Sequence, residues 1–358
     1  MIRTPVRIGF IGTGRISDLH AAGYLGTAAA RITALCDTNV ERARSRARAW
    51  GLDDAMVTDD PAVLLSRNDV DLVEILLPHH LHCAAALAAI EAGKIVSLQK
   101  PMCLTMEEAN RLVDAAEAHD RPVRVFENIL FDQPVMVADT LVGDGAIGRP
   151  LAIRMKSNPG KGQGAWEVPS ETTAWRQRRD LSGGGPLIFD DGHHKFSLAW
   201  HFMGEPEEVH AFIGRTTHRD GSLLDAPSIV SLRFDEQRIG SFEAIYSPDL
   251  EIETRQYPQD DRIEITGTSG IIWINRGHGS IGNQPSVLCF RNGELDSTHE
   301  ACSRWEDSFV RATRHFLTCL QEGHAPVLTA RNARSVLRFA LAAEESARIG
   351  RAVRYTDT

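Results

Sequence analysis

The sequence contains no long hydrophobic run and no excess of positive charge. Its apolar stretches, such as Leu72 to Leu77, are far shorter than the roughly 20 residues that a membrane-spanning helix needs. The net charge of −9 argues against nucleic acid or an anionic membrane as a partner. The first strand pattern begins at Val6, and this early start leaves no room for a secretion signal.

Paired cysteines are missing as well. Six cysteines are scattered through both halves of the chain, and none belongs to a C-x-x-C pair. They are Cys36, Cys83, Cys103, Cys289, Cys302 and Cys319. This pattern is typical of reduced thiols in a cytoplasmic protein and argues against a disulfide framework or a zinc site. A chain of 358 residues, with 42% apolar and 24% charged residues, fits a globular protein of two domains.

A glycine-rich turn follows the first predicted strand. The strand covers Val6 to Ile11, Gly12-Thr-Gly14 interrupts it, and a helical pattern begins at Ile16. Glycine at such a turn allows a tight bend and close approach of a pyrophosphate, while the helix N-terminus offers N–H groups to the phosphates. Ser17 stands at the third glycine position and is small enough for close packing. Asp37 ends the next apolar run, where a carboxylate would accept hydrogen bonds from ribose hydroxyls. The spacing predicts a dinucleotide site.

Residues 1–127 alternate strand and helix patterns. Strands are predicted at 6–11, 32–35, 70–77, 95–98 and 123–126, with longer helices at 40–50, 81–92 and 105–119. Thr105 and Glu108 have the spacing of a capping box for the last of these helices. The repeated unit predicts a doubly wound parallel sheet, that is, a Rossmann domain.

Residues 128–358 have a different pattern. Strands are predicted at 151–155, 209–213, 229–234, 239–246, 262–266, 271–274 and 287–290, and helices at 134–142 and 187–203. Strands that follow one another without helices predict a large open, mostly antiparallel sheet with helices on one face. A final amphipathic helix is expected at about 331–349, where it can pack back on the first domain. We therefore predict an α/β protein whose second domain, 128–358, is an α+β domain for substrate binding and oligomerisation.

Two stretches carry polar groups that folding alone does not explain. Gln99-Lys100-Pro101 follows a predicted parallel strand at the edge where α/β sheets bind ligands. A lysine there can donate to a substrate hydroxyl or to a developing oxyanion, although a surface lysine is the alternative. In Asp190-Asp191-Gly192-His193-His194, Asp190 and His194 are four residues apart on one face of a predicted helix. A carboxylate beside an imidazole makes a base that works near neutral pH, although a helix-entry acid and a capped histidine without a catalytic role are the alternative.

Neither histidine cluster predicts a metal site. His193 and His194 are adjacent and point in different directions on a helix, and no third ligand is suggested elsewhere. In Pro78-His79-His80-Leu81-His82, the histidines are expected to begin a helix, with some of them contacting a cofactor and the rest in water.

The motifs resemble the glucose-fructose oxidoreductase / inositol dehydrogenase (Gfo/Idh/MocA) family over nearly the whole chain. The matching stretches are 9–17, Pro78 with His82, Ala92-Gly93-Lys94, Lys100-Pro101, Gly145-Ala-Ile-Gly148, Trp175-Arg176, Gly183-Gly-Gly185, Asp190-x-Gly192-x-His194, Glu345-Ser346-Ala347 and Gly350-Arg-Ala-Val353. The resemblance implies an oxidoreductase with NAD in the first domain, NADP being less favoured, and a sugar, polyol or sugar acid on the second domain.

The resemblance also implies a set of site residues. Lys100, Asp190 and His194 are the expected catalytic residues: His194 takes the hydroxyl proton, Asp190 holds the imidazole and Lys100 stabilises the oxygen. The cofactor contacts are expected to be Gly12, Gly14, Arg15, Ile16, Asp37, Leu77, Pro78, His82, Gln99 and Lys100. The substrate contacts are expected to be Lys100, Asn128, Lys156, Trp175, Arg176, Asp190 and His194. Dimers or tetramers are also expected.

Three positions depart from the family pattern. The usual Glu-Lys-Pro is Gln99-Lys100-Pro101, which keeps a hydrogen-bonding side chain but loses a charge. The acid usual three residues after the histidine is Ser197, and the basic pair usual after the family's asparagine is Ile129-Leu130. The last two departures touch substrate contacts and so weaken any transfer of substrate identity.

The leading function is therefore an NAD-dependent dehydrogenase that oxidises a secondary hydroxyl. The alternatives are a redox-neutral lyase or glycosidase that oxidises its sugar transiently, and a non-catalytic sugar sensor. Basic residues crowd the second-domain motifs and suit a carboxylated or phosphorylated sugar, although a solvated basic surface or a contact with a cofactor phosphate explains them equally well. They are Lys156, Lys161, Arg176, Arg178, Arg179 and Lys195.

Overall fold

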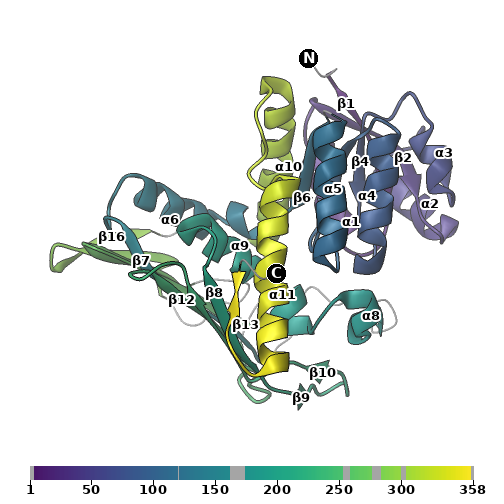
Figure 1. The fold of residues 1–358 in the computed structure, drawn as a ribbon. Helices are drawn as coiled ribbons and strands as arrows, with labels where there is room; N and C mark the ends of the chain where they lie inside the picture. The colour runs from purple at the N-terminus through teal and green to yellow at the C-terminus, as the bar shows by residue number, and fades with distance from the viewer. Residues whose placement is uncertain are drawn as a thin grey trace. The chain divides into compact units, whose positions relative to one another are not determined.

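Apolar runs separated by helices form a parallel sheet, as the alternation predicts. The sheet has six strands in the order β3-β2-β1-β4-β5-β6, and every pairing is parallel (Figure 1). The strands are β1 (Val6–Ile11), β2 (Ala30–Cys36), β3 (Met56–Thr58), β4 (Leu72–Ile75), β5 (Ile95–Gln99) and β6 (Val123–Phe126). The order reverses between β1 and β4, and ligands of such sheets bind at that point. The predicted doubly wound sheet is confirmed.

Helices connect these strands, and the first turn of the last of them is capped as its sequence predicts. The helices are α1 (Ser17–Leu25), α2 (Val40–Ala49), α3 (Pro61–Leu65), α4 (His82–Glu91) and α5 (Met106–Ala118), with a 3₁₀ turn, η1 (His79–Leu81), before α4. The Glu108 N–H donates to Thr105 Oγ1 at 3.2 Å, and Glu108 Oε2 accepts from the Leu104 N–H at 2.9 Å. The predicted capping box is therefore present, with its return bond one residue earlier.

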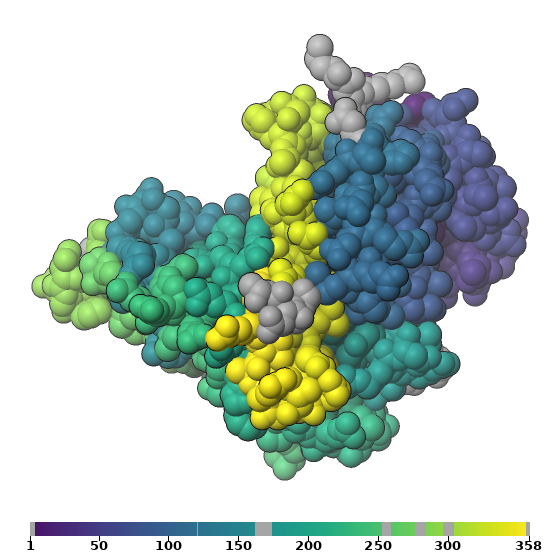
Figure 2. All heavy atoms as spheres, in the orientation of Figure 1, coloured from purple at the N-terminus to yellow at the C-terminus, as the bar shows by residue number. Residues whose placement is uncertain are grey.

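The structure, a computed structural model, describes residues 4–119, 121–161, 174–252, 259–275, 284–299 and 304–355. Its contacts divide the chain into two units, Met1–Asn128 with Glu306–Leu337 and Ile129–Trp305 with Arg338–Thr358. Helix α10 (Trp305–Glu322), for which we made no prediction, lies almost entirely in the first unit. Figure 2 shows α10 and α11 (Ala330–Ile349) in yellow-green and yellow. The boundary after residue 127 and the packing of the final helix stay predictions.

The second unit is built on a nine-stranded sheet. Its order is β16-β15-β14-β13-β7-β12-β11-β8-β17, and among the described strands of this sheet only the pair β7·β12 is parallel. The strands are β7 (Pro150–Pro159), β8 (Glu208–Ile213), β11 (Ser228–Arg233), β12 (Ile239–Ala244), β13 (Gln259–Gly267), β14 (Gly270–Ile274), β15 (Val287–Arg291), β16 (Glu294–His299) and β17 (Val353–Arg354). A separate hairpin pairs β9 (Thr216–Thr217) with β10 (Leu223–Leu224). The mostly antiparallel sheet is confirmed.

One face of this sheet is buried and the other is open. Side chains alternate along β11, where Val230 and Leu232 are buried while Ile229 and Ser231 are exposed. The remaining elements are η2 (Ile129–Phe131), α6 (Gln133–Gly143), η3 (Ala174–Gln177), α8 (Arg179–Ser182), η4 (Pro186–Asp190) and α9 (Gly192–Met203). Phe196 of α9 packs on Phe242 of β12 and on Phe339 of α11.

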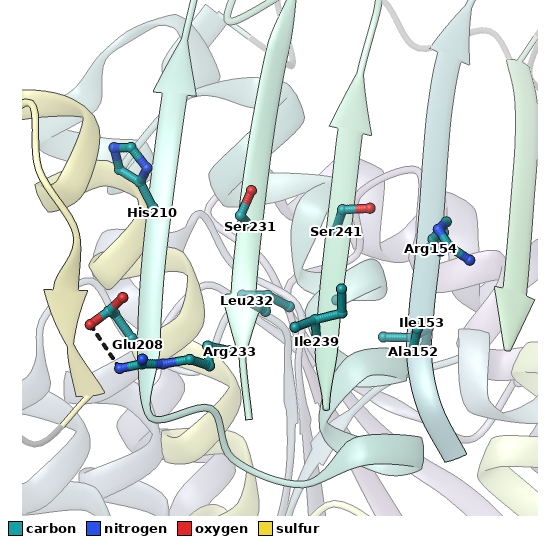
Figure 3. A pocket seen from close by; sticks show the side chains of 11 residues that line it. Ala152, Ile153, Arg154, Glu208, His210, Ser231, Leu232, Arg233, Ile239 and Ser241 are labelled. Atoms are coloured by element: carbon teal, nitrogen blue, oxygen red, sulfur yellow. Dashed lines mark hydrogen bonds and ion pairs between the residues drawn. The ribbon is translucent and has the colours of Figure 1, made fainter. Parts of the chain in front are cut away.

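A pocket of about 310 Å³ lies on the sheet of the second unit. Side chains of β7, β8, β11 and β12 line it, among them Arg154, His210, Ser231 and Ser241 (Figure 3). None of its lining residues is a predicted site residue, so we do not assign the substrate to this pocket.

Two further predictions concern membrane-spanning helices and the state of the cysteines. No described helix is long and apolar enough to cross a bilayer. Five cysteines, Cys36, Cys83, Cys103, Cys289 and Cys319, are buried free thiols, and Cys302 lies outside the described residues.

Candidate active site

The turn between β1 and α1 has the geometry that a dinucleotide needs. Gly12 has a φ of +96°, and a Cβ placed there would lie 2.3 Å from the Leu76 carbonyl oxygen. A Cβ at Gly14 would meet nothing within 4 Å, so a side chain there would fill open space above the turn. Ser17 is buried and its Oγ donates to the Gly14 carbonyl at 2.6 Å. No side-chain hydrogen bond caps the start of α1, whose positive end can attract a pyrophosphate. These residues fit NAD.

Asp37 lies at the other side of this site, and its carboxylate already accepts several hydrogen bonds from the protein. Oδ2 accepts from the Thr13 N–H at 2.8 Å and from Thr13 Oγ1 at 2.9 Å. Arg42 donates to both carboxylate oxygens, at 3.1 and 2.6 Å. Burial opposes ionisation, but the Arg42 guanidinium and the N–H groups of Asn39 and Thr13 outweigh it and lower the pKa of Asp37. Asp37 is therefore a carboxylate at neutral pH, partly neutralised by Arg42.

The remaining predicted cofactor residues lie at the carboxyl ends of β1, β4 and β5. Arg15 is exposed, and Ile16, Leu77 and Pro78 are half-buried. His82 is fully buried instead, and its ring nitrogens lie 2.6 Å from the Pro101 oxygen and 2.8 Å from the Leu77 oxygen. It thus ties the end of β4 to the segment after Lys100. Its predicted contact with the cofactor stays a prediction.

Lys100 and Asn128 follow β5 and β6 at the same edge of the sheet. Lys100 is half-buried, and its backbone N–H donates to Gln99 Oε1 at 2.7 Å. Asn128 is buried and donates through Nδ2 to Ser308 Oγ of α10 at 3.0 Å. The sheet order therefore brings the predicted cofactor residues, Lys100 and Asn128 to one edge of the first unit.

In the second unit, a π-helical turn carries Asp190. Hydrogen bonds from the Asp190 N–H to Gly185 O (3.1 Å) and from the Asp191 N–H to Pro186 O (3.0 Å) define the turn. Buried Asp225 holds its start, because its two carboxylate oxygens accept from the Leu187 and Ile188 N–H groups at 2.7 and 2.8 Å. π-Helical turns are rare and frequent at functional sites.

Asp190 lies among predicted substrate residues. Its Oδ2 is 3.0 Å from Arg176 Nε, and the Arg176 guanidinium lies over the Trp175 ring at 5.2 Å. His194 is half-buried in the first turn of α9, whereas His193 is buried with Nδ1 against the Phe189 carbonyl. The structure therefore gathers Trp175, Arg176 and Asp190, and it separates the environments of the two histidines as predicted from helical spacing.

The basic residues that suggested an acidic sugar are paired with acids. Lys156 contacts Asp260, Arg179 contacts Glu344, and buried Lys195 donates to Asp261 at 3.0 Å. Lys161 pairs with Glu251 at 2.8 Å and Arg178 with Asp180 at 2.6 Å. The positive charge that suggested an acidic sugar is therefore largely compensated within the protein.

Sequence reasoning missed a buried polar cluster behind Lys100. His20, Glu74 and Ser97 have no exposed surface, and Arg124 is 4% exposed. Glu74 in an otherwise apolar strand was the available signal, because a carboxylate there needs partners. Among the described residues, no group of three or more His, Cys, Asp or Glu side chains is arranged to hold a metal ion.

Two family profiles together match nearly the whole chain. The first, described as the oxidoreductase family with an NAD-binding Rossmann fold, matches residues 6–127, and its C-terminal alpha/beta domain matches residues 140–355. The chain belongs to the Gfo/Idh/MocA oxidoreductase family. The predicted family, the oxidoreductase class and the NAD cofactor are thereby confirmed.

Individual relatives are similar over most of their length. Myo-inositol 2-dehydrogenase of Thermotoga maritima is 26% identical, and the alignment covers 98% of each chain. Inositol 2-dehydrogenase of Acidothermus cellulolyticus is 30% identical, with 86% of this chain and 81% of that protein covered. An oxidoreductase of Agrobacterium radiobacter, solved with NAD+, L-tartaric acid and magnesium, shares the fold, with a TM-score of 0.81 at 21% identity over 99% of both chains.

Proposed function

We propose that the protein is an NAD-dependent dehydrogenase that oxidises a secondary hydroxyl group of a sugar or polyol. The observation that carries the proposal is the position of Lys100, which follows β5 at the sheet edge that also holds the dinucleotide turn. The relatives named inositol 2-dehydrogenase support a polyol substrate.

Each catalytic residue has a distinct role in this proposal. His194 takes the proton of the hydroxyl group, because a neutral imidazole nitrogen can accept a proton. Asp190, held by Arg176, orients the imidazole, and Lys100 donates to the oxygen as its negative charge grows. NAD, when bound at Gly12, Gly14 and Asp37, supplies the acceptor for the hydride.

The paired charges of the second unit narrow the substrate class. A carboxylated or phosphorylated sugar would have to compete with Asp260, Asp190 and Glu344 for its basic partners. We therefore favour neutral sugars and polyols, whose hydroxyl groups can hydrogen-bond to these pairs without separating them.

A substrate screen with NAD tests the reaction class. Inositols, aldoses and sugar acids are incubated with enzyme and NAD, and NADH formation is followed by absorbance. The proposal expects stoichiometric NADH with at least one neutral polyol or sugar. Substrate consumption without net NADH would support the redox-neutral lyase or glycosidase instead, and sugar acids as the only substrates would reject the preference for neutral ones.

Replacement of the proposed base tests the residue assignment. His194→Asn should lower turnover by roughly 10²–10⁴-fold, because asparagine cannot take the proton. NADH binding, measured by fluorescence titration, should hardly change. Lys100→Met should also lower turnover, since it removes positive charge from the reacting oxygen.

His193→Asn is the matched control, and thermal unfolding must accompany it because His193 is 3% exposed. It should change stability more than turnover. A folded His193→Asn enzyme without turnover, beside an active His194→Asn enzyme, would assign the base to His193.

A further inference from the structure

Three polar side chains, Gln99, His20 and Glu74, are hydrogen-bonded in a row that ends at the backbone N–H of Lys100. Gln99 lies at the end of β5, His20 in α1 and Glu74 in β4. Gln99 Oε1 lies 2.7 Å from the Lys100 nitrogen, Gln99 Nε2 lies 3.0 Å from His20 Nε2, and His20 Nδ1 lies 2.8 Å from Glu74 Oε1. His20 and Glu74 are fully buried, so each contact needs a correct donor and acceptor.

The peptide N–H of Lys100 determines the orientation of the Gln99 amide and, through it, the tautomer of His20. A backbone N–H can only donate, so the atom of Gln99 that faces it must be the oxygen. The Gln99 amide nitrogen then faces His20 Nε2 and donates to it. His20 Nε2 must therefore be the lone-pair nitrogen, and the ring proton is on Nδ1, from which it is donated to Glu74. Only the neutral Nδ1–H tautomer of His20 satisfies all three contacts.

The surrounding charges permit a neutral histidine. Glu74 also accepts from Tyr24 at 2.5 Å and from Ser97 at 2.9 Å, and Arg124 lies 3.6 Å from it. Arg124 therefore balances the Glu74 charge without a proton on His20. Burial lowers the pKa of His20 and outweighs the opposing effect of Glu74, while Arg124 lowers it further.

Two aromatic rings also pack beside His20. The Phe126 ring lies 4.0 Å and the Phe309 ring 5.4 Å from the imidazole, measured between ring centroids. Among the described residues, Glu74 of β4 and Arg124 of β6 are the charged groups that act on His20, and Tyr24 of α1 contacts both of them.

We propose that Glu74, His20 and Gln99 form a positioning relay that fixes the backbone at Lys100, and that the relay requires glutamine at position 99 because His20 is neutral. The family's usual glutamate at this position has only acceptor oxygens when ionised, so it would need a protonated His20. This inference rests on the proposed role of Lys100 in catalysis.

Gln99→Glu and Gln99→Leu test the relay. In Gln99→Glu, the new carboxylate should hold a proton on His20, so that turnover stays within about tenfold of wild type at low pH and falls as the pH rises through the new His20 pKa. In Gln99→Leu, the Lys100 N–H and His20 Nε2 lose their partner, and turnover should fall by at least about tenfold at every pH with little change in KM. Gln321→Glu, the same substitution on the exposed face of α10, should keep the wild-type pH profile.

Nitrogen-15 NMR of protein labelled at histidine measures the protonation state and the tautomer of His20 directly. The wild type should show His20, assigned by its absence in His20→Asn, as the neutral Nδ1–H tautomer from pH 5 to 8. Gln99→Glu should show an imidazolium in the acidic part of this range. A charged His20 or the Nε2–H tautomer in the wild type would overturn the proposal, as would wild-type turnover and pH profile in both Gln99 variants. Normal turnover of Lys100→Met would instead refute the proposed function, while the NMR result would still decide the relay.

Discussion

At the scale of single residues, we expect Asp37 and Arg42 to decide the choice between NAD and NADP. A carboxylate at this position accepts from the ribose hydroxyls of NAD and repels a 2′-phosphate, whereas a nearby arginine accommodates that phosphate. Here both residues are present, and Arg42 is bound to Asp37 at 2.6 Å. While Arg42 is bound to Asp37, it is not available to a 2′-phosphate. We therefore expect the Asp37 carboxylate to determine the preference for NAD.

We therefore expect tighter binding of NADH than of NADPH by about tenfold or more, which corresponds to about 1.4 kcal/mol. Asp37→Ser should reverse or abolish the preference, because it removes the repelling charge and releases Arg42. Arg42→Ala should keep NADH binding and weaken NADPH binding further. Fluorescence titration of the three proteins measures this. Equal or better use of NADP by the wild type would contradict the expectation.

At the scale of elements, the turn that carries Asp190 depends on close packing around glycine. Gly185 precedes the π-helical turn, and a Cβ there would lie 2.1 Å from Asp225 Oδ2. Asp225 in turn accepts from the first two N–H groups of that turn, so a shift of its carboxylate would affect Asp190. Burial raises the pKa of Asp225 despite these bonds. Glycine at position 185 therefore leaves the space that the Asp225 carboxylate occupies.

Gly185→Ala should therefore lower both stability and turnover. The expected loss in the free energy of unfolding is about 1–3 kcal/mol, the usual cost of overpacking. Gly143→Ala is the matched control, because a Cβ at Gly143 meets nothing within 4 Å and the residue has no positive φ. That control should be neutral or slightly stabilising. Urea unfolding and turnover of both variants measure the difference, and a Gly185→Ala enzyme as stable as wild type would contradict this account.

At the scale of the whole molecule, the open face of the nine-stranded sheet is the surface on which we expect another subunit to bind. Phe212 is 66% exposed and Ile239 is 56% exposed, and Phe212 pairs with exposed Ile229 across β8 and β11. Polar side chains lie on the same strands, as Figure 3 shows for His210, Ser231 and Ser241. A mixed face of this kind is typical of subunit interfaces.

We propose that copies of the chain pair through this face, either as a dimer or as the pairs that make up a tetramer. Phe212→Glu should shift the protein toward the monomer, because a carboxylate would be buried opposite an apolar partner. Val63→Glu places the same charge on an exposed apolar position of α3, in the other unit, and should leave the oligomer intact. Light scattering at micromolar concentration distinguishes the states. A monomeric wild type would rule out the proposal.

The sequence alone determined what depends on local order. The glycines at 12 and 14, the alternation of strands and helices, and the runs of strands after residue 150 predicted the dinucleotide turn and both sheets, because periodicity and turn chemistry are local properties. It also indicated Lys100, Asp190 and His194 through their places at strand and helix ends. Each of these signals lies within a few residues of the position it describes.

Only the tertiary structure decided which side chains are partners. His20, Glu74 and Gln99 are far apart in the chain and meet because β4 and β5 are neighbours beneath α1. Basic residues that look like an anion site in the sequence are paired with acids such as Asp260 and Glu344, more than 100 residues away. Hydrogen bonds and ion pairs act over a few ångströms in space, and a linear spacing carries no information about pairs that the fold brings together.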